Sequence, residues 1–373
     1  FGRVKASCAS RTGFDGNVSS ARSGMQMGTS TMQRVFLGCI GVLLWSGAQV
    51  RAGDAVTVAV SEPALLVPAC DVEESGFFQL AGTQTCMKIS GSITYDVSAG
   101  EDVYTGDPLH GVSPTAGAAV DIATASQTDL GTLETLISLD LGEPVDGGSG
   151  VTLSEAVVEL GGLMMGASSS QFDIWLNSAG AVLSDDVVAY GPSFTHFISY
   201  TASFENGLSA MVSVEDGEIL GGQISVFRES YPHVVAGLRL ETGQTEIGTV
   251  IGFDPVNDEL AAKIRFDFEM SDALSAFVMA GYRSRFGDPG YFGVWEGRYA
   301  AWAGFSFQAS EKTTFNGQAA YTDTGKFAIA TSVDYSLLPA LLITAELALT
   351  SFPTEAEPRE GALGAIISIE RAF

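Results

Sequence analysis

The chain has 373 residues, of which 44 are acidic and 18 are basic, so its net charge at pH 7 is −26. This excess of carboxylates argues against nucleic-acid binding, which depends on a basic footprint. The apolar fraction of 46% and the mean hydropathy of +0.24 argue against disorder. No uninterrupted apolar run of about 18 residues occurs, which argues against a bundle of membrane-spanning helices.

The first 52 residues have the character of leader sequence rather than folded domain. Residues 1–31 show no periodicity, and we expect them to be an unstructured, over-extended start. Residues 32–52 combine a short basic region, an apolar stretch over 35–45 and a small-residue ending, which predicts a secretory signal cleaved after Ala52. A membrane anchor is the alternative, but this apolar stretch is too short to span a bilayer. Residues 53–85 would then form an N-terminal segment.

Loss of residues 1–52 would change the net charge of the chain and the expected chemical state of its cysteines. The lost segment holds six bases and one acid, which leaves 43 acids and 12 bases, a net charge of −31. Cys70 and Cys86 remain, and an exported protein meets an oxidising compartment. We expect a disulfide between them, worth about 3 kcal/mol in the chain-entropy model. A metal site is less favoured because no C-x-x-C motif or nearby His accompanies them.

From Cys86 onward, apolar and polar residues alternate with a period of two. In the last segment, for example, Leu363, Ile367 and Ile369 fall on one face, whereas Ser368 falls on the other. Segments of about 10 residues with one apolar and one polar face are typical of transmembrane barrel strands. A soluble sandwich or propeller is the alternative. Charges on the polar faces and aromatic residues near strand ends favour the membrane.

Turn residues divide residues 86–373 into 16 expected strands, joined alternately by short and longer connections, as in outer-membrane barrels. The longer connections include 99–116, 170–192 and 216–231. The sequence therefore predicts an all-β, 16-stranded antiparallel transmembrane β-barrel, wide enough for an aqueous channel. The expected strands lie near 86–98, 117–127, 131–142, 153–160, 163–169, 193–204, 208–215, 232–242, 246–253, 258–269, 273–283, 298–309, 312–322, 325–336, 340–351 and 361–373.

The segment 70–91, CDVEESGFFQLAGTQTCMKISG, resembles the opening of the alphaproteobacterial general-porin family. That opening has a Cys, a Gly-aromatic-aromatic step and a Gly-Thr-x-Thr-Cys before the first strand. Segments 126–133 and 157–172 resemble the family's second-strand turn and its passage into the third loop. Phe373 matches the terminal aromatic that serves outer-membrane barrels as an assembly signal. The resemblance covers about 70–373.

The resemblance implies a homotrimer in outer-membrane lipid, inserted by the barrel-assembly machinery. It also implies a third loop that folds inward and narrows the pore, here residues 170–192. The constriction candidates on this loop are Asp173, Asp185 and Asp186. The alternative for these three residues is an ordinary solvated loop that carries acids.

Members of the family usually carry arginines on the wall facing the third loop, but the expected Gly-Arg is here Gly166-Ala167. This loss and the net negative charge lead us to hypothesise a cation-preferring pore. The alternative is that most acids lie in outer loops and leave the selectivity near neutral. The pore-lining candidates on the polar faces are Lys88, Asp121, Glu134, Asp140, Arg239, Lys263 and Arg265.

Motifs for catalysis are missing: the sequence has no Walker loop, no G-x-S-x-G and no H-E-x-x-H. We therefore expect no enzyme and no cofactor, and give little weight to a lipase-like site at His196. The acidic turn 254–259 lacks EF-hand spacing, so solvation is favoured over calcium binding.

The sequence predicts a porin for passive diffusion of small hydrophilic solutes and ions. A substrate-selective channel, which would need inward aromatic residues such as Trp302, is the alternative. A surface adhesin or structural barrel is a third possibility, which long repetitive loops would favour.

Overall fold

The computed structural model describes residues 76–142, 150–216, 231–287, 289–353 and 361–373, all within one compact unit, Val67–Phe373. Within these ranges no helix is long and apolar enough to cross a membrane. The elements are one short helix, α1 (Gln171–Ile174), and the strands β1 (Phe78–Gln79), β2 (Cys86–Glu101), β3 (Pro108–Thr128), β4 (Gly131–Gly142), β5 (Val151–Leu160), β6 (Leu163–Ser168), β7 (Thr195–Ser203), β8 (Leu208–Glu215), β9 (His233–Thr242), β10 (Thr245–Asp254), β11 (Glu259–Ser271), β12 (Leu274–Arg283), β13 (Tyr299–Ser310), β14 (Thr313–Thr322), β15 (Phe327–Leu338), β16 (Leu341–Ser351) and β17 (Ala362–Ala372).

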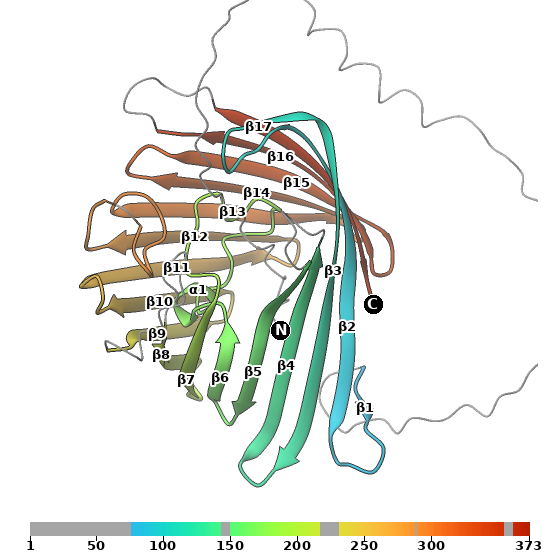
Figure 1. The fold of residues 1–373 in the computed structure, drawn as a ribbon, viewed down its shortest axis with the longest axis vertical. Helices are drawn as coiled ribbons and strands as arrows, with labels where there is room; N and C mark the ends of the chain where they lie inside the picture. Colours follow the sequence, from blue (N-terminus) through green and yellow to red (C-terminus); the bar gives the residue numbers. More distant parts are fainter. Residues whose placement is uncertain (1–75, 143–149, 217–230, 288, 354–360) are drawn as a thin grey trace, which may run out of the picture. The chain divides into compact units, whose positions relative to one another are not determined.

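Strands β2 to β17 form a closed antiparallel barrel of 16 strands (Figure 1). Each strand pairs with the next, and β17 pairs with β2 over Ser92 to Gly100. Two hydrogen bonds extend this seam: Phe373 N donates to Gly91 O at 2.9 Å, and Gly91 N donates to Phe373 O at 3.1 Å. Closure leaves no sheet edge, which a lipid environment requires because it offers backbone groups no other partners. The predicted fold class is confirmed.

Most strand bounds match the sequence prediction to within two or three residues, and those of β4 and β8 match without a shift. The expected long connection over 99–116 was wrong. In the structure β2 continues to Glu101 and β3 begins at Pro108, so only residues 102–107 connect them. The sequence of 108–116 hides this extension because it lacks hydrophobic alternation, and its strand character comes from backbone pairing with β2.

A further strand was not predicted. The two residues of β1 pair with Met87 and Cys86, at the end of β2 that β17 does not cover. Cys86 is disulfide-bonded. Its predicted partner, Cys70, lies outside the described residues.

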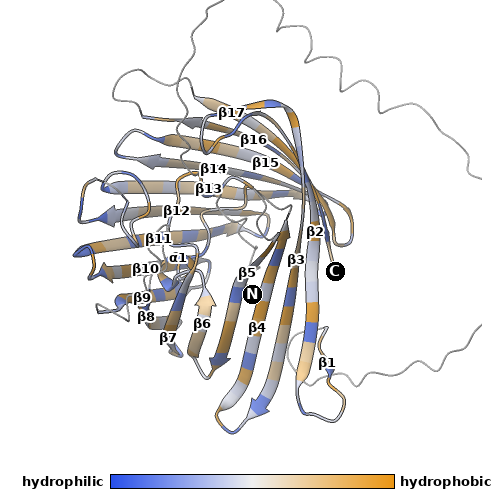
Figure 2. Ribbon diagram, in the orientation of Figure 1, coloured by the Kyte–Doolittle hydropathy of each residue, from blue (hydrophilic) through white to orange (hydrophobic). Residues whose placement is uncertain are grey.

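Hydrophobic and hydrophilic residues alternate along the strands (Figure 2), and the exposure of their side chains differs between the two faces of the barrel wall. Ile89 on β2 and Ile367 on β17 are 53% and 52% exposed, and they point outward. Their neighbours Lys88 and Ser368 lie on the inner face, where Ser368 is buried. An apolar outer face and a polar inner face are the arrangement of barrels that stand in lipid.

Aromatic residues are distributed unevenly around the outer face. Strands β3 to β6 contain no Phe, Tyr or Trp, nor do the pairs β8–β9 and β16–β17, and β6 has only 6 residues. Strands β10 to β15 carry many, in positions that alternate with the inner-face residues: Phe253, Phe266, Phe268, Tyr282, Tyr299, Phe305, Phe307, Phe315, Tyr321, Phe327 and Tyr335. Tyr and Trp gather where a barrel meets lipid headgroups. The sector β3–β6 is therefore the longest run of neighbouring strands without an aromatic residue.

Candidate functional site

The connection between β6 and β7, residues 169–194 (hereafter loop 3), folds into the barrel (Figure 1). It packs against the inner face of β8 to β16, where Phe172, Leu176 and Ala179 are fully or almost fully buried. The loop opens with α1, whose N-cap Ser170 accepts a hydrogen bond from Phe172 N at 3.0 Å. The predicted inward fold of the third loop is confirmed.

Acidic side chains of the wall hold loop 3 by its backbone N–H groups. Glu215 on β8 accepts hydrogen bonds from Ser170 Oγ at 2.7 Å and from Gln171 N at 2.9 Å. At the far end of the loop, Glu346 on β16 accepts from Ser184 N at 2.9 Å and also from Leu183 N. The two carboxylates thus fix loop 3 at opposite sides of the wall that it covers.

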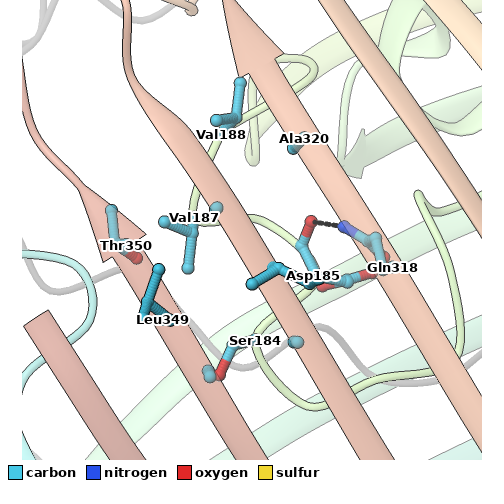
Figure 3. Close-up of a pocket in the computed structure, with 12 residues that line it drawn as sticks. Ser184, Asp185, Val187, Val188, Gln318, Ala320, Leu349 and Thr350 are labelled. Carbon is cyan, nitrogen blue, oxygen red and sulfur yellow. Dashed lines mark hydrogen bonds between the residues drawn. The ribbon is translucent and has the colours of Figure 1, made fainter. Parts of the chain in front are cut away.

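Donor side chains of the wall hold the carbonyl groups of loop 3. Lys263 Nζ donates to Tyr190 O at 2.7 Å, and Arg265 Nη1 donates to Ser178 O at 2.7 Å. Hydrogen bonds to charged groups each contribute about 1.5–3 kcal/mol, so several together keep the loop seated. Three further wall side chains donate to loop carbonyl groups: Arg239 to Trp175 O, Trp302 to Val188 O at 2.8 Å, and Gln318 to Asp185 O at 2.6 Å (the last in Figure 3).

Small residues on the inner wall make room for the loop. A Cβ at Gly237 on β9 would lie 2.5 Å from Trp175 Nε1, so a larger residue there would displace this side chain. Under the far end of the loop, Val187 and Val188 face a wall built largely from alanines (Figure 3). These inner-face alanines, on β14 to β16, are Ala320, Ala328, Ala330 and Ala348.

The inner-face bases under loop 3 are withdrawn from the lumen. Lys263 is 1% exposed and Arg265 is 6% exposed. Arg265 also pairs with Asp267 at 2.7 Å, and Arg239 pairs with Glu246 at 3.1 Å. The three bases predicted to line the pore on this wall therefore have loop carbonyls and wall carboxylates as partners.

The opposite wall, β2 to β6, has the reverse character. The only Lys or Arg on these strands is Lys88, whose Nζ lies 5.9 Å from the Phe77 ring centroid. Asp121 accepts from Ser138 Oγ at 2.6 Å, and Asp140 accepts from Ser154 Oγ. Strand pairing places six acids of this wall on the inner face: Asp96, Asp121, Glu134, Asp140, Glu155 and Glu159.

The three predicted constriction acids occupy different settings on loop 3. Burial raises the pKa of Asp173 to about 6, although the nearby Lys263 opposes this shift. Asp186 is half-buried at the far end of the loop and accepts a hydrogen bond from Tyr104 OH at 2.7 Å. Asp185, also half-buried, accepts from Tyr190 OH at 3.2 Å. Asp173 also interacts electrostatically with Asp186, and all three acids act on Tyr190, so the structure brings the three acids near one another.

Two other candidates from the sequence have ordinary settings. His196 is exposed on the outer face of β7, with its ring 6.0 Å from that of Phe194. In the turn after β10, Asp254 accepts hydrogen bonds from Val256 N and Asn257 N. Across the described ranges, no group of three His, Cys, Asp or Glu side chains is placed to hold a metal ion.

Known proteins give consistent matches. Residues 54–367 match the family model described as the porin subfamily. The chain is 36% identical to the porin Omp2b of Brucella canis over 347 residues, which cover 88% of this chain and 95% of that protein. Omp2b of Brucella abortus is 35% identical with the same coverage. The resemblance to alphaproteobacterial porins is therefore confirmed.

Solved structures with similar folds are also outer-membrane channels. The channel DcaP of Acinetobacter baumannii has a TM-score of 0.64 at 15% identity, covering 78% of this chain and 97% of that one. The anion-selective porin from Comamonas acidovorans has a TM-score of 0.55 at 13% identity, covering 78% and 100%. At such identities the likeness concerns the fold alone. Together with the sequence match, the closed barrel and its inward loop show that the chain belongs to the porin subfamily and forms an outer-membrane porin channel.

Proposed function

We propose that this porin is a passive diffusion channel for small hydrophilic solutes and ions, with a preference for cations. The observation that carries the proposal is the contrast between the two walls. Bases of β9 and β11 lie under loop 3, whereas six acids on the inner face of β2 to β5 accompany a single Lys. Carboxylates in a narrow, water-filled lumen attract cations and repel anions more strongly than they would in bulk water.

Passive flux is favoured over a substrate-selective channel. A selective pore would need aromatic side chains that a passing solute can touch. Trp302 lies on the inner face but is buried beneath loop 3. Phe172, which belongs to loop 3, is also buried. These rings serve the packing of the loop, which supports a general channel over a substrate-selective one.

The cation preference predicts a charge-dependent reversal potential. In a KCl gradient across a planar bilayer, the wild-type pore should pass K⁺ in preference to Cl⁻. The triple change Asp121→Asn, Glu134→Gln and Asp140→Asn should lower the permeability ratio by about 2-fold or more, because it removes charge from the lumen wall. The control alters turn acids outside the lumen, namely Asp129→Asn, Asp272→Asn and Glu311→Gln, and should leave the ratio unchanged. An anion-preferring wild type would refute the proposal.

We further propose that loop 3 sets the pore constriction, with Asp185, Asp186 and Asp173 as its charged residues. Gly237→Leu should push Trp175 off the wall and raise single-channel conductance or its fluctuations, because the seat of the loop is lost. Ala236→Leu, one residue away on the outer face, is the matched control and should behave as wild type. Equal conductance and equal fluctuations in the two variants would argue against a constricting role for loop 3.

Assembly into a homotrimer is proposed through the sector β3–β6. Its outer face is aliphatic and free of aromatic residues, as suits a contact with a second copy better than a headgroup interface. Val158 on β5 and Val278 on β12 are 41% and 46% exposed on the outer face.

Cysteine crosslinking should distinguish the proposed contact sector β3–β6 from the lipid-facing wall at β12. Val158→Cys should give covalent oligomers in isolated outer membranes when a short bifunctional thiol reagent is added, because the proposed contact brings copies of β5 close together. Val278→Cys, placed toward lipid, should remain monomeric on a denaturing gel. Crosslinking at position 278 but not at 158 would place the interface elsewhere.

The N-terminal region is proposed to direct export. Residues 32–52 would act as a signal peptide, 53–85 as a segment before the barrel, and Phe373 as the signal read by the barrel-assembly machinery. We expect protein isolated from the outer membrane to begin at Gly53. An N-terminus within residues 1–52 would contradict cleavage at this site.

A further inference from the structure

A second segment enters the barrel beside loop 3. Residues 289–298, which lead into β13, place Phe292 and Trp295 against the inner wall, where they are 1% and 2% exposed. A Cβ at Gly252 on β10 would lie 2.6 Å from the Phe292 ring, and one at Gly281 on β12 would lie 2.9 Å from Trp295. Glycines on the inner wall thus leave space for these two rings, as Gly237 does for Trp175 of loop 3.

The wall holds this segment by its carbonyl groups, as it holds loop 3. Arg283 on β12 is buried and donates to Gly293 O at 3.0 Å and to Trp295 O at 3.2 Å. Glu259 on β11 lies 3.4 Å from Arg283 and balances its charge. A base held between a carboxylate and two carbonyl groups keeps the segment inside the barrel instead of letting it extend outward.

The two inward segments also touch each other. The rings of Phe292 and Phe172 lie 5.2 Å apart, and Tyr291 stacks on His233 of β9 at 4.0 Å. Tyr291 OH donates to Glu215 Oε2 at 3.1 Å, the same oxygen that accepts from Ser170 of loop 3. Burial and the neighbouring Glu215 raise the pKa of the Tyr291 hydroxyl, so it keeps its proton and remains a donor.

We propose that residues 289–298 form a second constriction segment, which occupies the lumen next to loop 3 and is locked to it through the shared carboxylate of Glu215. This inference rests on the proposed channel function and adds to it a second determinant of pore size. Loop 3 fixes one boundary of the passage, and the second segment keeps loop 3 seated and fills the space between it and β9 to β12. Solute size is then set by both segments together.

The first test removes the two buried rings. Phe292→Ser with Trp295→Ser should raise single-channel conductance about 1.5-fold, because the segment loses its seat on the wall and no longer fills the lumen beside loop 3. In liposome-swelling assays the variant should also admit larger neutral sugars. Phe286→Ser is the matched control, since Phe286 precedes the segment and is 68% exposed. Heat-modifiable gel mobility would establish that each variant has folded.

The second test changes a single hydroxyl and serves even where the double variant fails to fold. Tyr291→Phe should increase brief closures and current noise in the open channel at least about 2-fold, because loop 3 loses its link to the second segment. Tyr231→Phe, at an exposed tyrosine, should leave the noise unchanged. A purely structural role would lower thermal stability without altering the current.

The outcomes separate this inference from the channel function itself. A wild-type protein that gives no current would refute the channel. A conducting wild type whose Tyr291→Phe variant, and folded double variant, reproduce its conductance and noise would refute only the second constriction segment.

Discussion

The structure depends on the rule that lipid leaves no backbone polar group without a partner. Sixteen strands meet this rule by closing on themselves, with Ser92 of β2 opposite Ala372 of β17 at the seam. Closure sorts the side chains by parity into two environments, lipid outside and water or loop inside. The same parity that makes Ile367 face outward places Glu346 and Lys263 where they can hold a loop.

Loop 3 packs on the side of the inner face that carries Arg239, Lys263 and Arg265. Bases on β9 and β11 become ligands for its carbonyl groups, and Glu346 and Glu215 become acceptors for its N–H groups. Among the described residues, the hydrogen bonds that seat loop 3 involve none of the acids of β2 to β5, whose charge we propose acts on passing ions. The seating of the loop and the proposed cation preference thus depend on one arrangement: basic side chains lie where the loop packs, and acidic ones lie across from it.

The sequence predicted most of the strands, because the alternation of apolar and polar residues indicates which face of the wall each residue occupies. It failed over 108–116, where backbone pairing alone makes a strand. It identified Lys263 and Arg265 as inner-face residues but could not show that a loop would cover them, because that depends on contacts between residues 73 and 87 positions apart. Glu215 and Glu346 were missed, as was the segment 289–298. Glycines on inner-face positions, such as Gly237 and Gly252, were the available signal.

The most direct measurement of the two-faced wall uses adjacent isoleucines on β17. Ile367 is 52% exposed to the outside, whereas Ile366 lies on the inner face opposite Ser98 and Glu346. Unfolding in lipid vesicles should show that Ile367→Arg lowers the free energy of unfolding by about 2–4 kcal/mol, while Ile366→Arg changes it by less than about 1 kcal/mol. Equal losses, or a greater loss at Ile366, would contradict a barrel with lipid outside and water within.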